Sequence, residues 1–282
     1  MQFSNFTAAL AITAGLSIAA PAWSQTADTA TTPAEPEATS ADASADSTET
    51  DADAPKQILF IGNSYFYYND SLHNHTRRMA GEASGIDIDD LDYRSITISG
   101  GSLDMHPIDH YLTPGAIGYD EPFDLVILQG NSAAAETEAR STRFHDAVVA
   151  MDEKIKATGA KTALYMTHAY AEGHEDYTPD GTEKLDKLYT DTGAEIGATV
   201  IPVGLAFAEA KRQRPELELQ QDFDHSHPTL AGTYLASAVT YATLYGKNPV
   251  GLEYDYFGRL PAEDAAFLQQ VAEETVKAYQ AR

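Results

Sequence analysis

Short apolar runs alternate with longer helical stretches from Lys56 to the last residue, and this alternation limits the fold more than any other feature. The pattern predicts strands at 58–61, 95–98, 123–128, 162–166 and 199–203, and helices at 71–83, 133–158, 182–197, from just after Thr229 to 245, and at 262–278. Strands that are apolar almost throughout are buried on both faces, and strand–helix repeats form parallel sheets with right-handed crossovers. We therefore expect an α/β fold, a three-layer α/β/α sandwich around a five-stranded parallel sheet.

The first 24 residues have the composition of an export signal. They contain no charged side chain, the stretch 8–20 is almost wholly apolar or small, and small residues precede a cleavage position after Ser24. This segment predicts a signal peptide, and hence an exported protein that is periplasmic or secreted and has no membrane contact after cleavage. A retained membrane anchor is the alternative that this pattern leaves open.

Residues 25–55 differ in composition from the rest of the chain. Apart from Gln25 they consist of Ala, Thr, Ser, Asp, Glu and Pro, and eight of them are carboxylates. Such a segment cannot bury enough apolar surface to offset its ordering entropy, which predicts a disordered acidic linker. The remaining stretch, 56–282, is then expected to form the single folded domain.

Charge and cysteine content exclude several classes of function. The chain has 18 basic and 43 acidic residues, a formal net charge of −25. Such a surface repels nucleic acid and anionic lipid, so neither is an expected partner. The absence of cysteine excludes disulfides, thiolate catalysis and thiolate zinc sites together.

Two short motifs carry residues suited to nucleophilic catalysis. Ser64 follows the first predicted strand at a strand-to-helix turn, where free N–H groups and a helix dipole favour an oxyanion; a helix-capping serine is the structural alternative. Asp224 precedes His227 by three residues, so one tight turn can bring the carboxylate to the imidazole. A serine needs such a base, and the base needs an orienting carboxylate. Asp222 and His225 have the same spacing and form an alternative pair.

Four blocks together resemble those of the SGNH (GDSL-like) hydrolases. They are Gly62-Asn63-Ser64, Gly100, Asn131 and Asp224-x-x-His227-Pro228. The resemblance implies a flavodoxin-like fold with Ser64 as nucleophile, Asp224 and His227 as the rest of the triad, and no cofactor. It also implies an oxyanion hole made by the Ser64 N–H, the Gly100 N–H and the Asn131 side chain.

The blocks depart from the family pattern at two positions. Asn63 replaces the commoner aspartate, and an amide can still hold that turn. Gln129 replaces a glycine two residues before Asn131, where it could add a donor to the oxyanion hole or fill space. Gly101 could serve in place of Gly100, although the local run favours Gly100.

Histidine pairs and aromatic residues offer further candidates. The histidine pairs 73/75, 106/110, 168/174 and 225/227 could suggest a metal, but no recognisable third ligand joins any pair, and we expect no metal. The run Tyr65–Tyr68 is predicted to pack against the sheet with at least two of its rings. Tyr170 and Tyr177 are better placed to line a site.

These features predict an exported carboxylic-ester hydrolase that works through an acyl-enzyme. Its substrate is expected to be a small-molecule or glycan ester, with O-acetyl or other short esters on glycans as the first choice. Two alternatives remain open: a lipase- or thioesterase-type short-chain esterase, and a catalytically silent SGNH-like module that binds a glycan or a protein.

Overall fold

The computed structural model describes residues 54–83 and 85–282. The predicted signal peptide and all of the predicted linker except Ala54 and Pro55 lie outside the described residues. Ala54 already packs against the core, and the Pro55 carbonyl accepts a hydrogen bond from the Tyr245 hydroxyl at 3.0 Å. In the described part of the chain, no helix is both long and apolar enough to cross a membrane.

The strands form one parallel sheet in the order β2-β1-β3-β4-β5. Their bounds are β1 Gln57–Gly62, β2 Asp92–Thr97, β3 Leu125–Gln129, β4 Lys161–Tyr165 and β5 Thr199–Ile201. The predicted five-stranded parallel sheet is confirmed. β2 begins three residues earlier than predicted, because an edge strand needs no continuous apolar run and pairing with β1 starts at Asp92.

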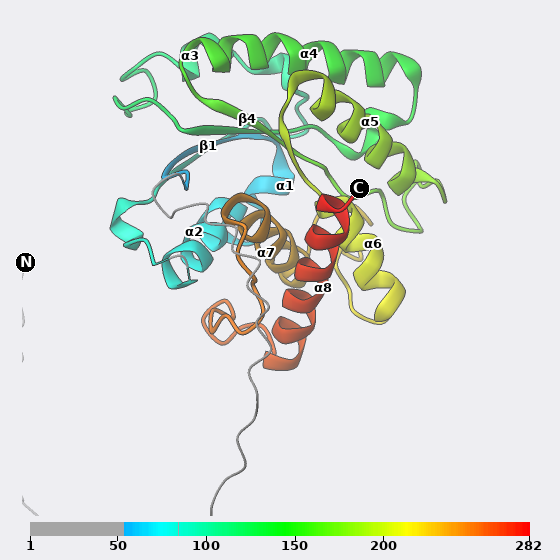
Figure 1. Ribbon diagram of the computed structural model, residues 1–282. Helices are drawn as coiled ribbons and strands as arrows, with labels where there is room; N and C mark the ends of the chain where they lie inside the picture. Colours follow the sequence, from blue (N-terminus) through cyan, green and yellow to red (C-terminus); the bar gives the residue numbers. More distant parts are fainter. Residues whose placement is uncertain (1–53, 84) are drawn as a thin grey trace, which may run out of the picture. The chain divides into compact units, whose positions relative to one another are not determined.

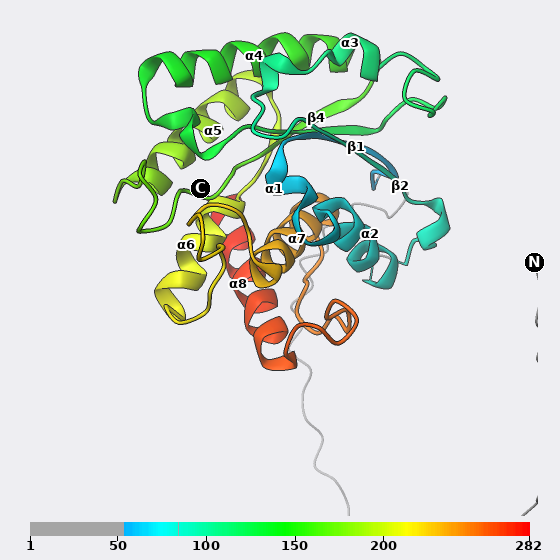
Figure 2. The same cartoon turned by 180° about the vertical axis from the view of Figure 1, so that it is seen from behind.

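Helices cover both faces of the sheet, which confirms the three-layer sandwich (Figures 1 and 2). One face carries α2 Leu72–Ala83, α6 Val203–Gln213, α7 Leu230–Tyr245 and α8 Ala262–Gln280; the other carries α3 Ile108–Tyr111, α4 Glu138–Ala157 and α5 Gly181–Ile196. The region predicted as one helix at 133–158 is a 3₁₀ turn, Ser132–Ala135, followed by α4, because Thr137 caps the N-terminus of α4.

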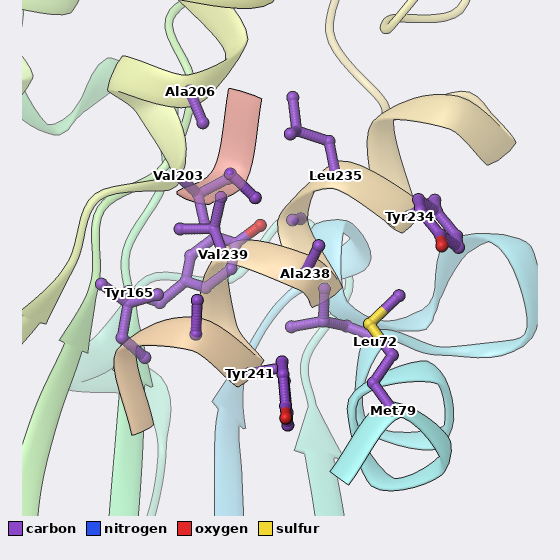
Figure 3. Packing of buried hydrophobic residues seen from close by; sticks show 14 of the residues in the cluster. Leu72, Met79, Tyr165, Val203, Ala206, Tyr234, Leu235, Ala238, Val239 and Tyr241 are labelled. Carbon is purple, nitrogen blue, oxygen red and sulfur yellow. The ribbon is translucent and has the colours of Figure 1, made fainter. Parts of the chain in front are cut away.

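Alternate residues of β1 supply two separate cores. Ile58 and Phe60 pack with α2, α6, α7 and α8, whereas Leu59 and Ile61 pack with α4 and α5. Figure 3 shows the first of these cores, with side chains of α7 between Val203 of α6 and the α2 residues Leu72 and Met79. This two-sided burial explains why the central strands are apolar throughout.

Helix α6 is the main element that the hydrophobic pattern did not predict. It starts at Val203 directly after Pro202, with no turn residues to separate it from β5. Gly204 lets it approach the loop after β4, because a Cβ there would lie 2.4 Å from the Thr167 carbonyl oxygen. A strand that leads straight into a helix has no boundary signal in its sequence.

The order of the strands reverses beside β1. The chain moves from β1 to one neighbour, β2, and then crosses to the other neighbour, β3. In open parallel sheets, ligands bind beyond the carboxyl ends of the strands at such a reversal. Helix α1, Ser64–Tyr67, begins at this point.

Candidate active site

The serine turn, residues 62–68, is built onto the end of β1. Ser64 is the first residue of α1, and the Asn63 side-chain oxygen caps the helix by accepting the Tyr65 N–H at 3.2 Å. The Asn63 amide nitrogen donates to the carbonyl oxygens of Gly101 and Gly130, each at 3.2 Å. Asn63 therefore ties the segments that follow β1, β2 and β3 together. The aspartate of the commoner motif has no side-chain N–H group and could not donate these two hydrogen bonds.

Gln129 supports the serine turn from beneath. Its side chain is almost fully buried, its Oε1 accepts the Asn63 N–H at 2.9 Å, and its amide nitrogen donates to the Gly130 carbonyl. Gly62 leaves room for it, because a Cβ at that position would lie 2.3 Å from Gln129 Oε1. Both ends of the Gln129 amide are thus used inside the fold, and the glutamine is a support for the turn.

The acid–base loop, residues 220–229, holds Asp224 by hydrogen bonds. Asp224 Oδ1 accepts the backbone N–H groups of Ser226 and His227, each at 3.0 Å, and Oδ2 accepts His227 Nδ1 at 2.5 Å. Burial raises the pKa of Asp224, but these hydrogen bonds outweigh it and hold the pKa below its ordinary value. Asp224 is therefore an ionised acceptor near neutral pH.

His227 joins the acid–base loop to the serine turn. Its Nε2 lies 2.7 Å from Ser64 Oγ. Because Nδ1 donates to the Asp224 carboxylate, Nε2 of the neutral ring is free to accept the Ser64 hydroxyl proton. Tyr68 stacks on the imidazole, with ring centroids 4.2 Å apart, and Tyr65 meets it edge-on at 5.5 Å. The structure thus brings Ser64, His227 and Asp224 into one continuous chain of hydrogen bonds.

Three unused N–H donors lie in the segments around the serine. The Ser64 N–H is at the first position of α1, where no intrahelical acceptor exists. In the described part of the chain no acceptor bonds the Gly100 N–H, whereas the Gly101 N–H is bonded to the Ile98 carbonyl at 2.9 Å, which favours Gly100 over Gly101 as a donor. The Asn131 side chain makes no capping bond to the turn that it precedes.

Gly100 and Asn131 line the same cavity, of about 210 Å³. Ala134 and Phe144 form apolar parts of its lining, and Arg143, paired with Asp104 at 2.8 Å, is a polar part. Two of the three predicted oxyanion donors therefore share a small cavity that has both polar and apolar walls.

A buried polar network beneath the triad went unrecognised in the sequence. The Tyr65 hydroxyl bonds the hydroxyls of Ser132 at 2.9 Å and Ser226 at 2.6 Å, and His168 Nε2 lies 2.8 Å from the Ser226 carbonyl oxygen. Burial lowers the pKa of His168 to about 4, so the ring is neutral and donates Nε2–H to that carbonyl. His168 stacks on Phe207 at 4.2 Å. Its position after β4 was the only sequence signal for this role.

The remaining sequence candidates have other contacts. The His225 ring lies against Gly173, and Ser64 Oγ meets His227, so the alternative Asp222–His225 pair is not brought to the serine. Tyr170 stacks on His174 at 3.7 Å, and Tyr177 is exposed. Over residues 54–83 and 85–282, no group of three His, Asp or Glu side chains is placed to hold a metal ion. Metal independence itself stays a prediction.

Comparison with solved structures identifies the fold. A candidate SGNH hydrolase from Slackia heliotrinireducens matches with a TM-score of 0.54 and 24% identity over 66% of this chain and 97% of that one. A DUF4886 family protein from Bacteroides uniformis matches with a TM-score of 0.59 and 18% identity over 80% and 95%. The lipase/acylhydrolase from Enterococcus faecalis matches with a TM-score of 0.52 and 17% identity over 67% and 96%.

These likenesses show that the chain has the fold of the SGNH hydrolases. The sequence itself matches no family model and no curated protein.

Proposed function

We propose that this chain is a serine carboxylic-ester hydrolase of the SGNH family that works through an acyl-enzyme. One observation carries the proposal: the hydrogen-bond chain from Asp224 through His227 to Ser64 at the carboxyl edge of the sheet. A serine that only capped a helix would not need these hydrogen bonds. The capping role in α1 also belongs to Asn63. The fold, which SGNH hydrolases share, supports the same reading.

The geometry supports a two-stage reaction. Ser64 Oγ attacks the ester carbonyl while its proton passes to His227 Nε2, and Asp224 stabilises the resulting imidazolium. The N–H groups of Ser64 and Gly100 and the Asn131 amide receive the oxyanion. His227 then gives its proton to the departing alcohol. A water molecule, deprotonated by His227, then attacks the acyl-enzyme, and His227 returns this proton to Ser64 Oγ as the carboxylic acid leaves.

The dimensions of the cavity beside the donors favour a short acyl group. At about 210 Å³ it is smaller than the ~300–1,000 Å³ of ordinary ligand pockets. The Arg143–Asp104 ion pair in its wall disfavours a long acyl chain, which would have to pass charged groups. We therefore propose O-acetyl or similarly short esters, carried by a glycan or a small alcohol, as the substrate class.

A chain-length series tests this proposal. Nitrophenyl acetate should be hydrolysed with a higher kcat/KM than nitrophenyl octanoate, O-acetylated oligosaccharides should release acetate, and Ser64→Ala should do neither. A preference for octanoate would favour a lipase- or thioesterase-type enzyme. A folded wild-type protein that hydrolyses no ester would favour a silent binding module.

We also propose that the protein is exported, on the basis of residues 1–24, which lie outside the described residues. Mass spectrometry of the exported protein should find a new N-terminus near Gln25. An intact Met1 on membrane-bound protein would instead favour the retained anchor.

A further inference from the structure

A second and larger cavity lies between α2 and the segment 254–259 that precedes α8. Its volume is about 520 Å³, and its walls include Arg77, Arg78 and Arg259. Figure 1 places α2 and this segment on the same face of the sheet. We call it the arginine cavity. None of its lining residues belongs to the triad or supplies a predicted oxyanion donor.

The arginines of this cavity lack carboxylate partners within the described part of the chain, which is unusual in a chain of net charge −25. The other six arginines of the chain each form an ion pair with a carboxylate: Arg94, Arg140, Arg143, Arg212, Arg214 and Arg282. Across residues 54–83 and 85–282, Arg77, Arg78 and Arg259 form none. Arg77 is occupied by the carbonyl oxygens of Leu91 and Ile88, at 2.7 and 2.5 Å. Among the described residues, Arg78 and Arg259 therefore have aromatic neighbours but no carboxylate partner.

Aromatic rings support both of these arginines. The Arg78 guanidinium lies 4.6 Å from the centre of the Phe257 ring, and that of Arg259 lies 5.6 Å from the centre of the Tyr256 ring. A stacked guanidinium keeps its N–H edge free for a planar oxyanion. Phe257 is 68% exposed and offers apolar ring surface beside the charge. One carboxylate, Asp70, also lines the cavity, and it accepts the Tyr256 hydroxyl.

Strained backbone is concentrated around this cavity. Within residues 54–83 and 85–282, six non-glycine residues have positive φ: Asn69, Asp70, Ser71, His225, Tyr256 and Phe257. All except His225 lie in two consecutive runs, 69–71 and 256–257, which the hydrogen bond from Tyr256 to Asp70 joins. Left-handed backbone at consecutive non-glycine residues is unfavourable, and such strain collects at ligand clamps and active sites.

The first of these runs also reaches the candidate active site. Tyr68, the residue directly before this run, stacks on His227. Within the run, the Asn69 amide donates to the Pro228 carbonyl at 3.0 Å, and Asp70 lines the arginine cavity. Two residues of extended chain span at most ~7 Å. The Cα atoms of Tyr68, which contacts the triad, and Asp70, which lines the cavity, are therefore at most ~7 Å apart.

We propose that the arginine cavity binds the carboxylate of an acidic saccharide, so that the esters cleaved are carried by a uronate-containing glycan. The guanidinium groups of Arg78 and Arg259 match a carboxylate, and the exposed Phe257 ring offers a face for a sugar. An isolated monoanion suits this acidic chain better than a phosphate dianion, because repulsion grows with ligand charge. This inference rests on the proposed function, since it specifies the glycan.

Binding measurements test the inference without relying on ester hydrolysis. Wild-type protein and Ser64→Ala should each be titrated, by calorimetry or NMR, with methyl glucuronoside, methyl glucoside and glucose 6-phosphate. We expect both proteins to bind the glucuronoside at least about tenfold more tightly than the other two ligands. Equal affinity for glucuronoside and glucoside, or no binding of either, would overturn the inference, and tighter binding of glucose 6-phosphate would replace the carboxylate with a phosphate.

Variants then locate the binding. The double substitution Arg78→Gln and Arg259→Gln should weaken glucuronoside binding about tenfold or more, whereas Arg212→Gln, which removes an exposed arginine on α6, should leave it unchanged. Unchanged binding by a folded double variant would place the ligand elsewhere and overturn the inference. If the double variant does not fold, the wild-type comparison of glucuronoside with glucoside still decides. A wild-type protein that binds glucuronoside but hydrolyses no ester would contradict the proposed function alone.

Discussion

The serine turn and the acid–base loop hold two halves of one hydrogen-bond chain, but they are held in place differently. The serine turn is continuous with the interior strand β1, and Ser64, Asn63 and Gln129 are 7%, 3% and 1% exposed. The side chains of Asp224 and His227 are each 25% exposed, and they lie on a loop that is held by hydrogen bonds, both within the loop and from Tyr65, Asn69 and His168. The first region depends on the packed core, and the second depends on hydrogen bonds.

Because of this difference, we expect substitutions in the two regions to affect stability and activity to different extents. A change in the supports of the serine turn disturbs buried groups and should lower the free energy of unfolding. A change in the acid–base loop removes partly solvated contacts and should lower activity while the fold persists. The following predictions test this separation, from the largest expected effect to the smallest.

Substitution at Asp224 should have the largest effect that leaves the fold intact. In Asp224→Asn the side-chain oxygen can still accept the N–H groups of Ser226 and His227, but the imidazolium loses its counter-charge and its orientation. We expect kcat/KM for nitrophenyl acetate to fall on the order of 10³–10⁴-fold. Asp224→Ala should also lose about 0.5–1.5 kcal/mol of stability, since it leaves both part-buried N–H groups without their acceptor. Steady-state kinetics and urea unfolding measure the two effects, and equal stability of the two variants would contradict this account of the loop.

Removal of the Asn131 side chain should have the next largest effect. If its amide receives the oxyanion, Asn131→Ala should lower kcat about 10²–10³-fold with little change in KM. Unfolding in urea should be close to wild type, because this side chain makes no capping bond. An unchanged kcat would mean that the third block is wrongly assigned, since Gln129 is already committed to Asn63 and Gly130.

The buried network beneath the acid–base loop predicts a pH-dependent stability. Burial lowers the pKa of His168 to about 4, and its ordinary value is 6.5. As the pH falls below 6.5, the unfolded chain binds a proton at this residue that the folded chain does not, so the free energy of unfolding falls. The decrease reaches ~3 kcal/mol near pH 4. The variant His168→Gln keeps a donor for the Ser226 carbonyl, and its free energy of unfolding in urea should fall correspondingly less between pH 6.5 and 4. If this free energy falls equally with pH in the variant and the wild type, His168 is excluded as the cause.

A substitution at Gln129 tests how the serine turn is supported. In Gln129→Leu the volume stays similar, but the Asn63 N–H loses its acceptor inside the fold. We expect a loss of about 1–3 kcal/mol in the free energy of unfolding. The kcat of the fraction that remains folded should fall less than in Asn131→Ala. A Gln129→Leu variant with normal stability and strongly reduced kcat would contradict the claim that the supports of the serine turn act mainly on stability.

The apolar runs of the sequence were sufficient to predict the sheet, and two short motifs were sufficient to place Ser64 and the Asp224–His227 pair, while the candidate oxyanion donors came from the resemblance to the SGNH hydrolases. Local patterns could not predict which side chains would support them. Gln129 meets Asn63 across 66 residues, and His168 meets Ser226 across 58, and such pairings exist only once the strands are ordered. The arginine cavity went unpredicted for the same reason: Arg78 and Arg259 are far apart in the chain and come together only through the turn before α8.

Covalent trapping tests the central claim most directly. Wild-type protein incubated with a fluorophosphonate and digested should carry the adduct on Ser64, located by tandem mass spectrometry. His227→Ala should form it at least about 100-fold more slowly, because the serine then has no base. An adduct on another serine, such as Ser132 or Ser226, or none on folded wild-type protein, would contradict the assignment of Ser64 as nucleophile.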